Sequence, residues 1–147
     1  MSEGKKVVIQ LHKAAVYHNI NPYKELTTKN YHTEGERVLD NLSLQVNEGE
    51  LVYLIGRTGS GKSSLLKTLY GELPFFEGEG TVVGFDLKGL KTKQIPILRR
   101  NVGVVFQDVT VLSKCNVFEN LAFVLRATHW SDEQKISERI SEVLRQV

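Results

Sequence analysis

Hydrophobic positions along the chain are spaced in ways that predict several β-strands. Short apolar runs at Val7–Leu11 and Thr81–Val83 predict strands. In the second half of Leu39–Val46, leucine and valine alternate with polar residues, which predicts a strand with one buried face. The runs Leu51–Ile55 and Val102–Phe106 are apolar almost throughout, so we expect them to form strands that are buried on both faces.

Three other segments have the spacing and end residues of helices. Ser63–Tyr70 follows a glycine-rich loop and reads as the first helix. Asn116 is a suitable N-cap for a helix over Val117–Ala127. Ser131 is expected to cap the last helix, and Gln134, three residues further on, would complete a capping box. This last helix places its apolar residues on one face: Ile136, Ile140, Val143, Leu144 and Val147.

Residues 56–64 form a glycine-rich loop between an apolar run and the first helix, and they match the phosphate-binding pattern G-x-x-x-x-G-K-[ST]. Glycines allow the backbone to turn successive N–H groups toward a phosphate, and the following helix adds a positive dipole. A chance match is the alternative, but the flanking strand and helix argue against it. We expect Lys62 to bind the outer phosphates and the Ser63 hydroxyl to bind Mg²⁺. The candidate nucleotide ligands here are Gly56, Arg57, Thr58, Gly59, Ser60, Gly61, Lys62, Ser63 and Ser64.

Composition restricts the class of protein further. The chain has 147 residues, is 41% hydrophobic and carries a net charge of +2, which fits one domain of ordinary size. Its charged residues are interspersed, and no basic stripe indicates nucleic-acid binding. The N-terminus does not read as a signal peptide, and no apolar run reaches the length of a membrane span. The single cysteine, Cys115, cannot form an internal disulfide and fits a reducing compartment.

A site that hydrolyses nucleotides also needs an acidic residue, and two aspartates follow apolar segments. Asp86 comes after Val82–Phe85, and Asp108 comes after Val102–Gln107. Either position suits a carboxylate that holds Mg²⁺ or positions the attacking water. Neither aspartate is followed by a glutamate, and for Asp86 a turn at the strand end is the favoured interpretation.

Three segments together resemble the N-terminal part of an ABC-transporter ATPase: Gly56–Ser64, Ile95–Asp108 and Asn116–Leu121. The string Leu-Arg-Arg-x-Val-Gly-Val-Val-Phe-Gln-Asp within the second segment is similar to that of the FtsE group of cell-division ATP-binding proteins. Lipoprotein-release ATPases and other ABC exporters share the general pattern. The resemblance extends over Val7–Val147, except for the polar segment His18–Glu36, which is longer than the usual hairpin there.

The resemblance implies an α/β fold of the P-loop NTPase type, in its ABC ATPase form. Residues 1–147 would form a single partial ATP-binding domain. Its parts would be a RecA-like core over residues 1–108, with an inserted polar loop at 18–36, and the start of a helical subdomain over residues 109–147. We expect Val7–Leu11 and Leu39–Val46 to form an antiparallel β edge of this partial core.

The resemblance also implies further site residues. Gln107 matches the Q-loop glutamine, which in the family contacts Mg²⁺ and the γ-phosphate and senses the membrane partner. The family stacks an aromatic ring on adenine shortly after the first strand. Tyr17 has that position and is favoured, and Tyr31 is the alternative because its distance from the phosphate loop is nearer the usual one if the inserted loop is discounted. The implied cofactors are ATP and Mg²⁺, with Ser63 and Gln107 as the metal ligands.

Several motifs of the family do not occur in these 147 residues: the Leu-Ser-Gly-Gly-Gln signature, the Walker B strand with its glutamate, the D-loop and the switch histidine. We therefore expect an N-terminal portion with no catalytic residue of its own, which binds ATP without turnover. The complete protein is implied to be a homodimeric ATPase. It would be peripheral on the cytoplasmic face of the inner membrane, bound to an integral, FtsX-like membrane subunit. A small-molecule kinase and a nucleotide-binding module without activity are the alternatives.

Overall fold

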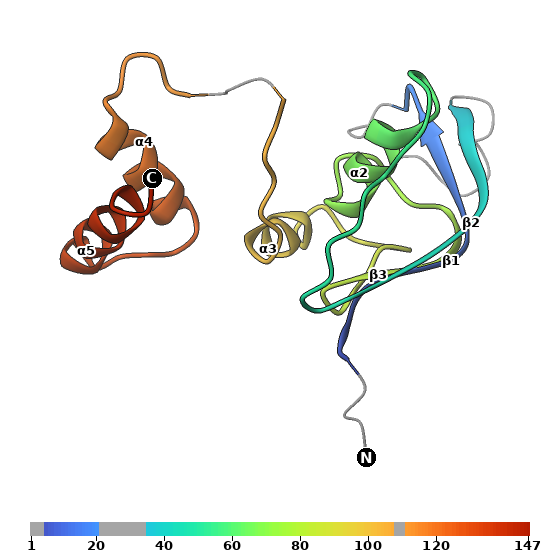
Figure 1. Cartoon of the computed structure of the whole chain (residues 1–147), viewed down its shortest axis with the longest axis horizontal. Coiled ribbons are helices and arrows are strands. Elements are labelled where there is room, and N and C mark those ends of the chain that lie inside the picture. The colour runs from blue at the N-terminus through green and yellow to red at the C-terminus, as the bar shows by residue number, and fades with distance from the viewer. Residues whose placement is uncertain (1–4, 21–34, 108–110) are drawn as a thin grey trace. The chain divides into compact units, whose positions relative to one another are not determined.

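The computed structural model describes residues 5–20, 35–107 and 111–147 (Figure 1). It divides into two compact units, Met1–Gly103 and Val104–Val147. The first unit contains β1 (Val7–His18), β2 (Glu36–Asn47), α2 (Lys62–Leu69), β3 (Glu77–Val82), β4 (Phe85–Asp86) and α3 (Ile95–Arg100). The second contains α4 (Val117–Ala127) and α5 (Glu133–Leu144).

The first unit is built on an antiparallel four-stranded sheet in the order β2-β1-β3-β4. β1 lies between two partners, so that Leu11 pairs with Leu44 of β2 and with Gly80 of β3. The antiparallel pair that the sequence predicts for Val7–Leu11 and Leu39–Val46 is thereby confirmed. β1 continues to His18, beyond its predicted end, because its second half also pairs with both neighbours through an irregular, bulged register.

A hydrophobic core holds α2 against one face of this sheet. Its buried members are Leu11, Ala14, Val16, Leu65, Leu69, Phe75, Val82, Leu87 and Leu98. A separate cluster contains Ala15, Tyr17 and Ile20, with Phe76 packed against it. Successive residues of a strand point to opposite faces, and this separates Val16, which packs with α2, from Tyr17, which does not. α2 itself confirms the predicted helix over Ser63–Tyr70 to within a residue at each end.

Two predicted strands are wrong. Leu51–Ile55 and Val102–Phe106 have irregular backbone and do not join the four-stranded sheet. Their side chains lie largely in solvent: Ile55 is 89% exposed and Val105 is 100% exposed. A strand that is buried on both faces needs hydrogen-bonded neighbours and a covering layer, and within the described residues neither run has them.

The second unit is a pair of packed helices, α4 and α5 (Figure 1). As predicted, Asn116 caps α4; its side chain accepts from the Glu119 N–H, and the Glu119 carboxylate accepts from the Asn116 N–H, which completes a capping box. The helices bury Ala122 on α4 against Ile136 and Ile140 on α5.

The predicted start of the last helix is wrong by one residue. Asp132, not Ser131, is the N-cap of α5, and its carboxylate accepts from the Gln134 N–H at 3.0 Å and the Lys135 N–H at 3.2 Å. An ionised oxygen makes a stronger bond to these amides than a hydroxyl does. The predicted apolar face is confirmed at its beginning and not at its end, because Val147 is 101% exposed.

No helix within the described ranges is both long enough and apolar enough to cross a membrane.

Candidate functional site

The glycine-rich loop leads directly into α2, and its glycines have the conformations that the motif requires. Gly59 and Gly61 have φ values of 81° and 85°, in the left-handed region that other residues rarely adopt. Gly61 is the N-cap of α2 and also lies close to β2. A Cβ atom at Gly61 would lie 3.0 Å from Leu39 and 3.2 Å from Val38. The loop can therefore turn into the helix here only with glycine.

The start of α2 is suited to binding an anion. The first bond of the helix runs from the Leu65 N–H to the Gly61 carbonyl at 2.8 Å, so the N–H groups of Lys62, Ser63 and Ser64 have no carbonyl partner within the helix. The first turn contains no acidic side chain. These three amides and the positive end of the helix dipole therefore favour a phosphate group at this position.

The side chain of Lys62 turns back into the loop that precedes it. Its ammonium donates to the carbonyls of Gly56 and Arg57, both at 2.7 Å, and to the Ser60 hydroxyl at 3.4 Å. The positive charge is thus held inside the ring of loop residues that the sequence predicts to surround the phosphates. These contacts of Lys62 join the two ends of the predicted segment Gly56–Ser64.

The two serines at the start of α2 have different surroundings. Ser63 is exposed, and its hydroxyl is the kind of hard oxygen ligand that Mg²⁺ prefers, so this residue fits the metal implied by the resemblance. Ser64 is only 6% exposed, and its hydroxyl lies 3.2 Å from Nδ1 of His18 at the end of β1. Sequence reasoning missed His18, because a single histidine at the start of a polar segment matches no motif.

Tyr17, the predicted adenine platform, is not brought to the phosphate loop. It is 2% exposed and lies in the cluster on the sheet face that α2 does not cover. The Tyr17 hydroxyl donates to the Glu77 carboxylate and accepts from Nε of Arg37 at 3.0 Å. The Arg37 guanidinium lies 5.5 Å from the Tyr17 ring centroid, and the Phe76 ring approaches edge-on at 6.4 Å. An adenine ring thus finds no open face of Tyr17 in this structure.

Burial, reinforced by the hydrogen bond to Glu77, raises the pKa of Tyr17 to about 12, so the phenol stays neutral over the ordinary pH range. The rival platform, Tyr31, lies outside the described residues.

The remaining candidates are Asp86, Asp108 and Gln107. Asp86 accepts from the Lys88 N–H at 2.8 Å, which supports the interpretation of a turn aspartate. Asp108 lies outside the described residues. Gln107 is exposed and belongs to the second unit, so its role at the phosphates stays a prediction that rests on the resemblance.

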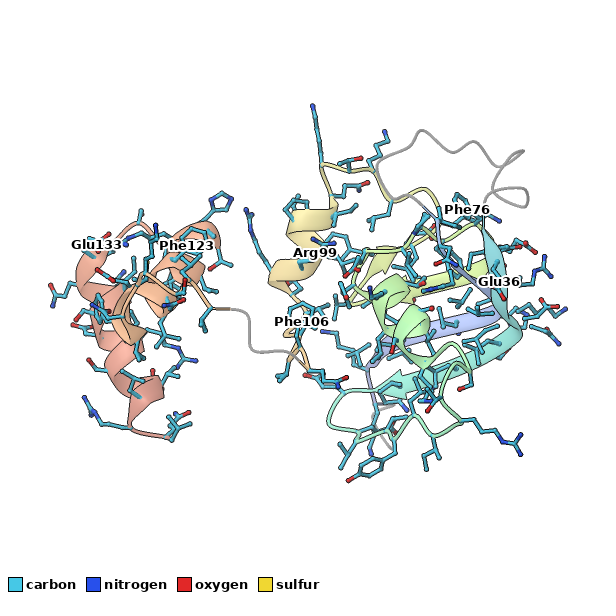
Figure 2. All side chains as sticks on the ribbon, turned by 90° about the horizontal axis from the view of Figure 1, so that it is seen from above. Glu36, Phe76, Arg99, Phe106, Phe123 and Glu133 are labelled. Atoms are coloured by element: carbon cyan, nitrogen blue, oxygen red, sulfur yellow. The ribbon has the colours of Figure 1, made fainter. Side chains whose placement is uncertain are left out.

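Arg99, labelled on α3 in Figure 2, has a structural role. Its guanidinium donates to the carbonyls of Tyr70 (3.1 Å) and Gly71 (3.3 Å), just beyond the end of α2, where a cation suits the negative end of the helix dipole. Arg99 is therefore engaged in packing, and it gives no support to the alternative of a small-molecule kinase with arginines in a mobile lid.

Curated relatives match the chain over most of its length. FtsE, the cell division ATP-binding protein, is 40% identical over 110 residues in Streptococcus pneumoniae and in Bacillus subtilis; the match covers 75% of this chain and 47% and 48% of those proteins. MetN, the methionine import ATP-binding protein of Wolinella succinogenes, is 38% identical over 107 residues, covering 73% of this chain and 35% of MetN. The chain thus spans about half the length of the FtsE proteins that it matches.

A solved structure agrees with the fold. The ATP-binding cassette MJ0796, in a dimeric post-hydrolysis state bound to ADP and Pi, superposes with a TM-score of 0.73 at 23% identity, covering 94% of this chain and 56% of that one. The sheet, the phosphate loop and the helices are therefore those of a partial P-loop NTPase core of the ABC ATPase type. The model of the ABC transporter family matches residues 39–147. This match, supported by the relatives above and by the glycine geometry of the loop, shows that the chain belongs to the ABC transporter family.

Proposed function

We propose that the chain is the nucleotide-binding part of an ATPase subunit of an ABC-type complex. The observation that carries this proposal is the loop Gly56–Ser64. Its carbonyls bind the Lys62 ammonium, and it ends at the first amides of α2, which have no carbonyl partner within the helix. Those donors suit the negatively charged β- and γ-phosphates of ATP. Ser63 would hold Mg²⁺, and the resemblance to the family implies Gln107 as a further protein ligand. The metal would neutralise charge that develops during phosphoryl transfer.

Stacking of adenine on Tyr17 is the weaker part of this proposal. For that contact, the Tyr17 ring would have to leave its hydrogen bond to Glu77 and turn away from Phe76. The Arg37 guanidinium over its ring would also have to move. An adenine contact at this position therefore requires a local rearrangement of the end of β1.

The binding proposal is tested by removing one charge at a time from α2. Lys62→Ala should weaken MgATP binding by about tenfold or more, because a charge-assisted bond to the phosphates is lost while the backbone cradle remains. Lys67→Ala is the matched control: it removes the same charge from the same helix, at a lysine that pairs with Glu72 at 2.7 Å. Equal affinities for the wild type and Lys62→Ala, measured by calorimetry on the complete gene product, would rule out the loop as the nucleotide site.

We further propose that the 147-residue chain alone does not turn ATP over. Positioning and electrostatic stabilisation provide nearly all of the acceleration in phosphoryl transfer, and the chain contains no Leu-Ser-Gly-Gly-Gln signature. A phosphate-release assay should give background rates at every protein concentration. Robust turnover that is lost on changing Asp86 or Asp108 would instead identify a complete enzyme.

For the task of the complete protein, we propose coupling of ATP hydrolysis to a membrane partner of the cell-division type, as a homodimer at the cytoplasmic face of the membrane. This rests on the 40% identity to FtsE. Methionine import is the second candidate, supported by the 38% identity to MetN; lipoprotein release and other export remain further alternatives from the motif pattern. Depletion of the gene product separates the first two: failed septation with normal methionine uptake supports the first, and lost uptake in normally dividing cells supports the second.

A further inference from the structure

His18 lies where the end of β1 meets the start of α2. It follows Ala14 and Val16 at the next alternate position of the strand, and the side chains of those two residues pack on the sheet face that α2 covers. Nδ1 of His18 is 3.2 Å from the Ser64 hydroxyl. The two residues are 46 positions apart in the chain, so it is the fold that places an imidazole beside the phosphate loop, and not the local sequence.

Ser64 has a setting in which the direction of its hydroxyl hydrogen matters. It is the third residue of α2, it is 6% exposed, and its carbonyl already accepts from the Thr68 hydroxyl at 2.9 Å. The hydroxyl has one hydrogen to donate. If that hydrogen goes to Nδ1 of His18, the hydroxyl can offer only lone pairs to an anion at the loop. If Nδ1 carries the hydrogen and donates, the Ser64 hydrogen is free for the anion.

We propose that His18 is a positioning residue of the nucleotide site: its Nδ1–H donates to Ser64 Oγ, and the Ser64 hydroxyl then donates to a phosphate oxygen of the bound nucleotide. This inference rests on the proposed function. Because two successive hydrogen bonds that point the same way strengthen each other, phosphate binding and the Nδ1–H form of the imidazole favour one another. Tyr17, one residue earlier, points to the other face and has no such route to the loop.

Two variants separate the hydrogen bond from the bulk of the ring. His18→Asn places an amide N–H near the position of Nδ1, and His18→Ala removes the donor. In the complete gene product, His18→Ala should weaken MgATP binding roughly three- to tenfold, the range for one neutral hydrogen bond, and His18→Asn should bind within about twofold of the wild type. Adding Ser64→Ala to His18→Ala should weaken binding less than Ser64→Ala does alone, since the two act as a unit.

A spectroscopic measurement reports the proposed bond directly. In the ¹⁵N spectrum of the histidine rings, assigned with the His18→Asn variant, Nδ1 of His18 should be protonated when MgATP is bound. An unprotonated Nδ1 in the complex overturns the proposal, as does wild-type affinity in His18→Ala, or an Asn variant that binds as poorly as the Ala variant. Lys62→Ala distinguishes failure of the His18 proposal from failure of the proposed nucleotide site. If Lys62→Ala weakens MgATP binding while His18→Ala does not, the loop is still the nucleotide site and only the role of His18 is wrong.

Discussion

Apolar residues in this chain have two different environments. In the core of the first unit, Leu65 is 2% exposed and Leu98 is 0% exposed. In the run that leads into the phosphate loop, Leu51 is 79% exposed and Ile55 is 89% exposed. The residue types are the same, and the difference is that α2 and α3 pack on partners, whereas the run finds no covering layer among the residues that the structure describes. Hydrophobicity thus predicts which surfaces a protein must cover, and it leaves open what covers them.

The strongest test of this comparison uses two neighbouring leucines on α2. Leu65 is buried and Leu66 is 53% exposed, although both have the same helix propensity. Leu65→Ala should lower the free energy of unfolding by about 2–5 kcal/mol, the range for a buried leucine. Leu66→Ala should change it by less than about 0.5 kcal/mol. Urea denaturation of both variants measures the difference, and similar losses would mean that the two residues are equally buried in solution.

The second unit has a smaller core, with Ala122, Ile136 and Ile140 as its buried residues, so the ends of its helices matter more. Asp132→Ala removes the N-cap of α5 and should destabilise this unit by about 1 kcal/mol. Ser131→Ala is the matched control and should change stability by less than about 0.5 kcal/mol. Thermal denaturation followed by circular dichroism compares them. A larger loss of stability for Ser131→Ala than for Asp132→Ala would show that Ser131 is the N-cap, as the sequence predicts.

The smallest expected effect is at the exposed run itself. Ile55→Ser should leave the stability of the 147-residue chain within about 0.5 kcal/mol of the wild type, because an exposed side chain has little burial to lose. The same substitution in the complete gene product sharpens the comparison. A clear destabilisation there, with slow amide exchange over Leu51–Ile55, would show that further residues of the protein cover this run as a buried strand.

Local features of the fold could be read from the sequence. The loop Gly56–Ser64, the helix that follows it and the Asn116 cap depend on residues close together in the chain, and these three elements lie where the sequence predicts them, the helix to within one residue at each end. The choice between Ser131 and Asp132 as a cap failed because both residues have side-chain acceptors, and the sequence pattern did not distinguish the Ser131 hydroxyl from the more strongly bonding Asp132 carboxylate.

Features that depend on distant residues could not be predicted in the same way. The bulged register of β1 sets which face Tyr17 and His18 point to, and nothing in the local sequence indicates a bulge there. The contact between His18 and Ser64 needs β1 and α2 side by side. The exposure of Leu51–Ile55 reflects the absence of sheet neighbours within the described residues, which its apolar composition alone does not reveal.

The bonds between Lys62 and the loop carbonyls also affect the thermodynamics of phosphate binding. The ammonium begins from a state in which two short hydrogen bonds, at 2.7 Å each, are already made. An arriving phosphate exchanges some of these bonds for new ones, so the enthalpy of binding is a difference between two bonded states and is smaller than the number of new contacts indicates. The side chain is already ordered in the loop, and this lowers the entropy lost when ligand binds. We therefore expect phosphate binding to release less heat, and to cost less side-chain entropy, than it would with a lysine that is free in solvent before the ligand arrives.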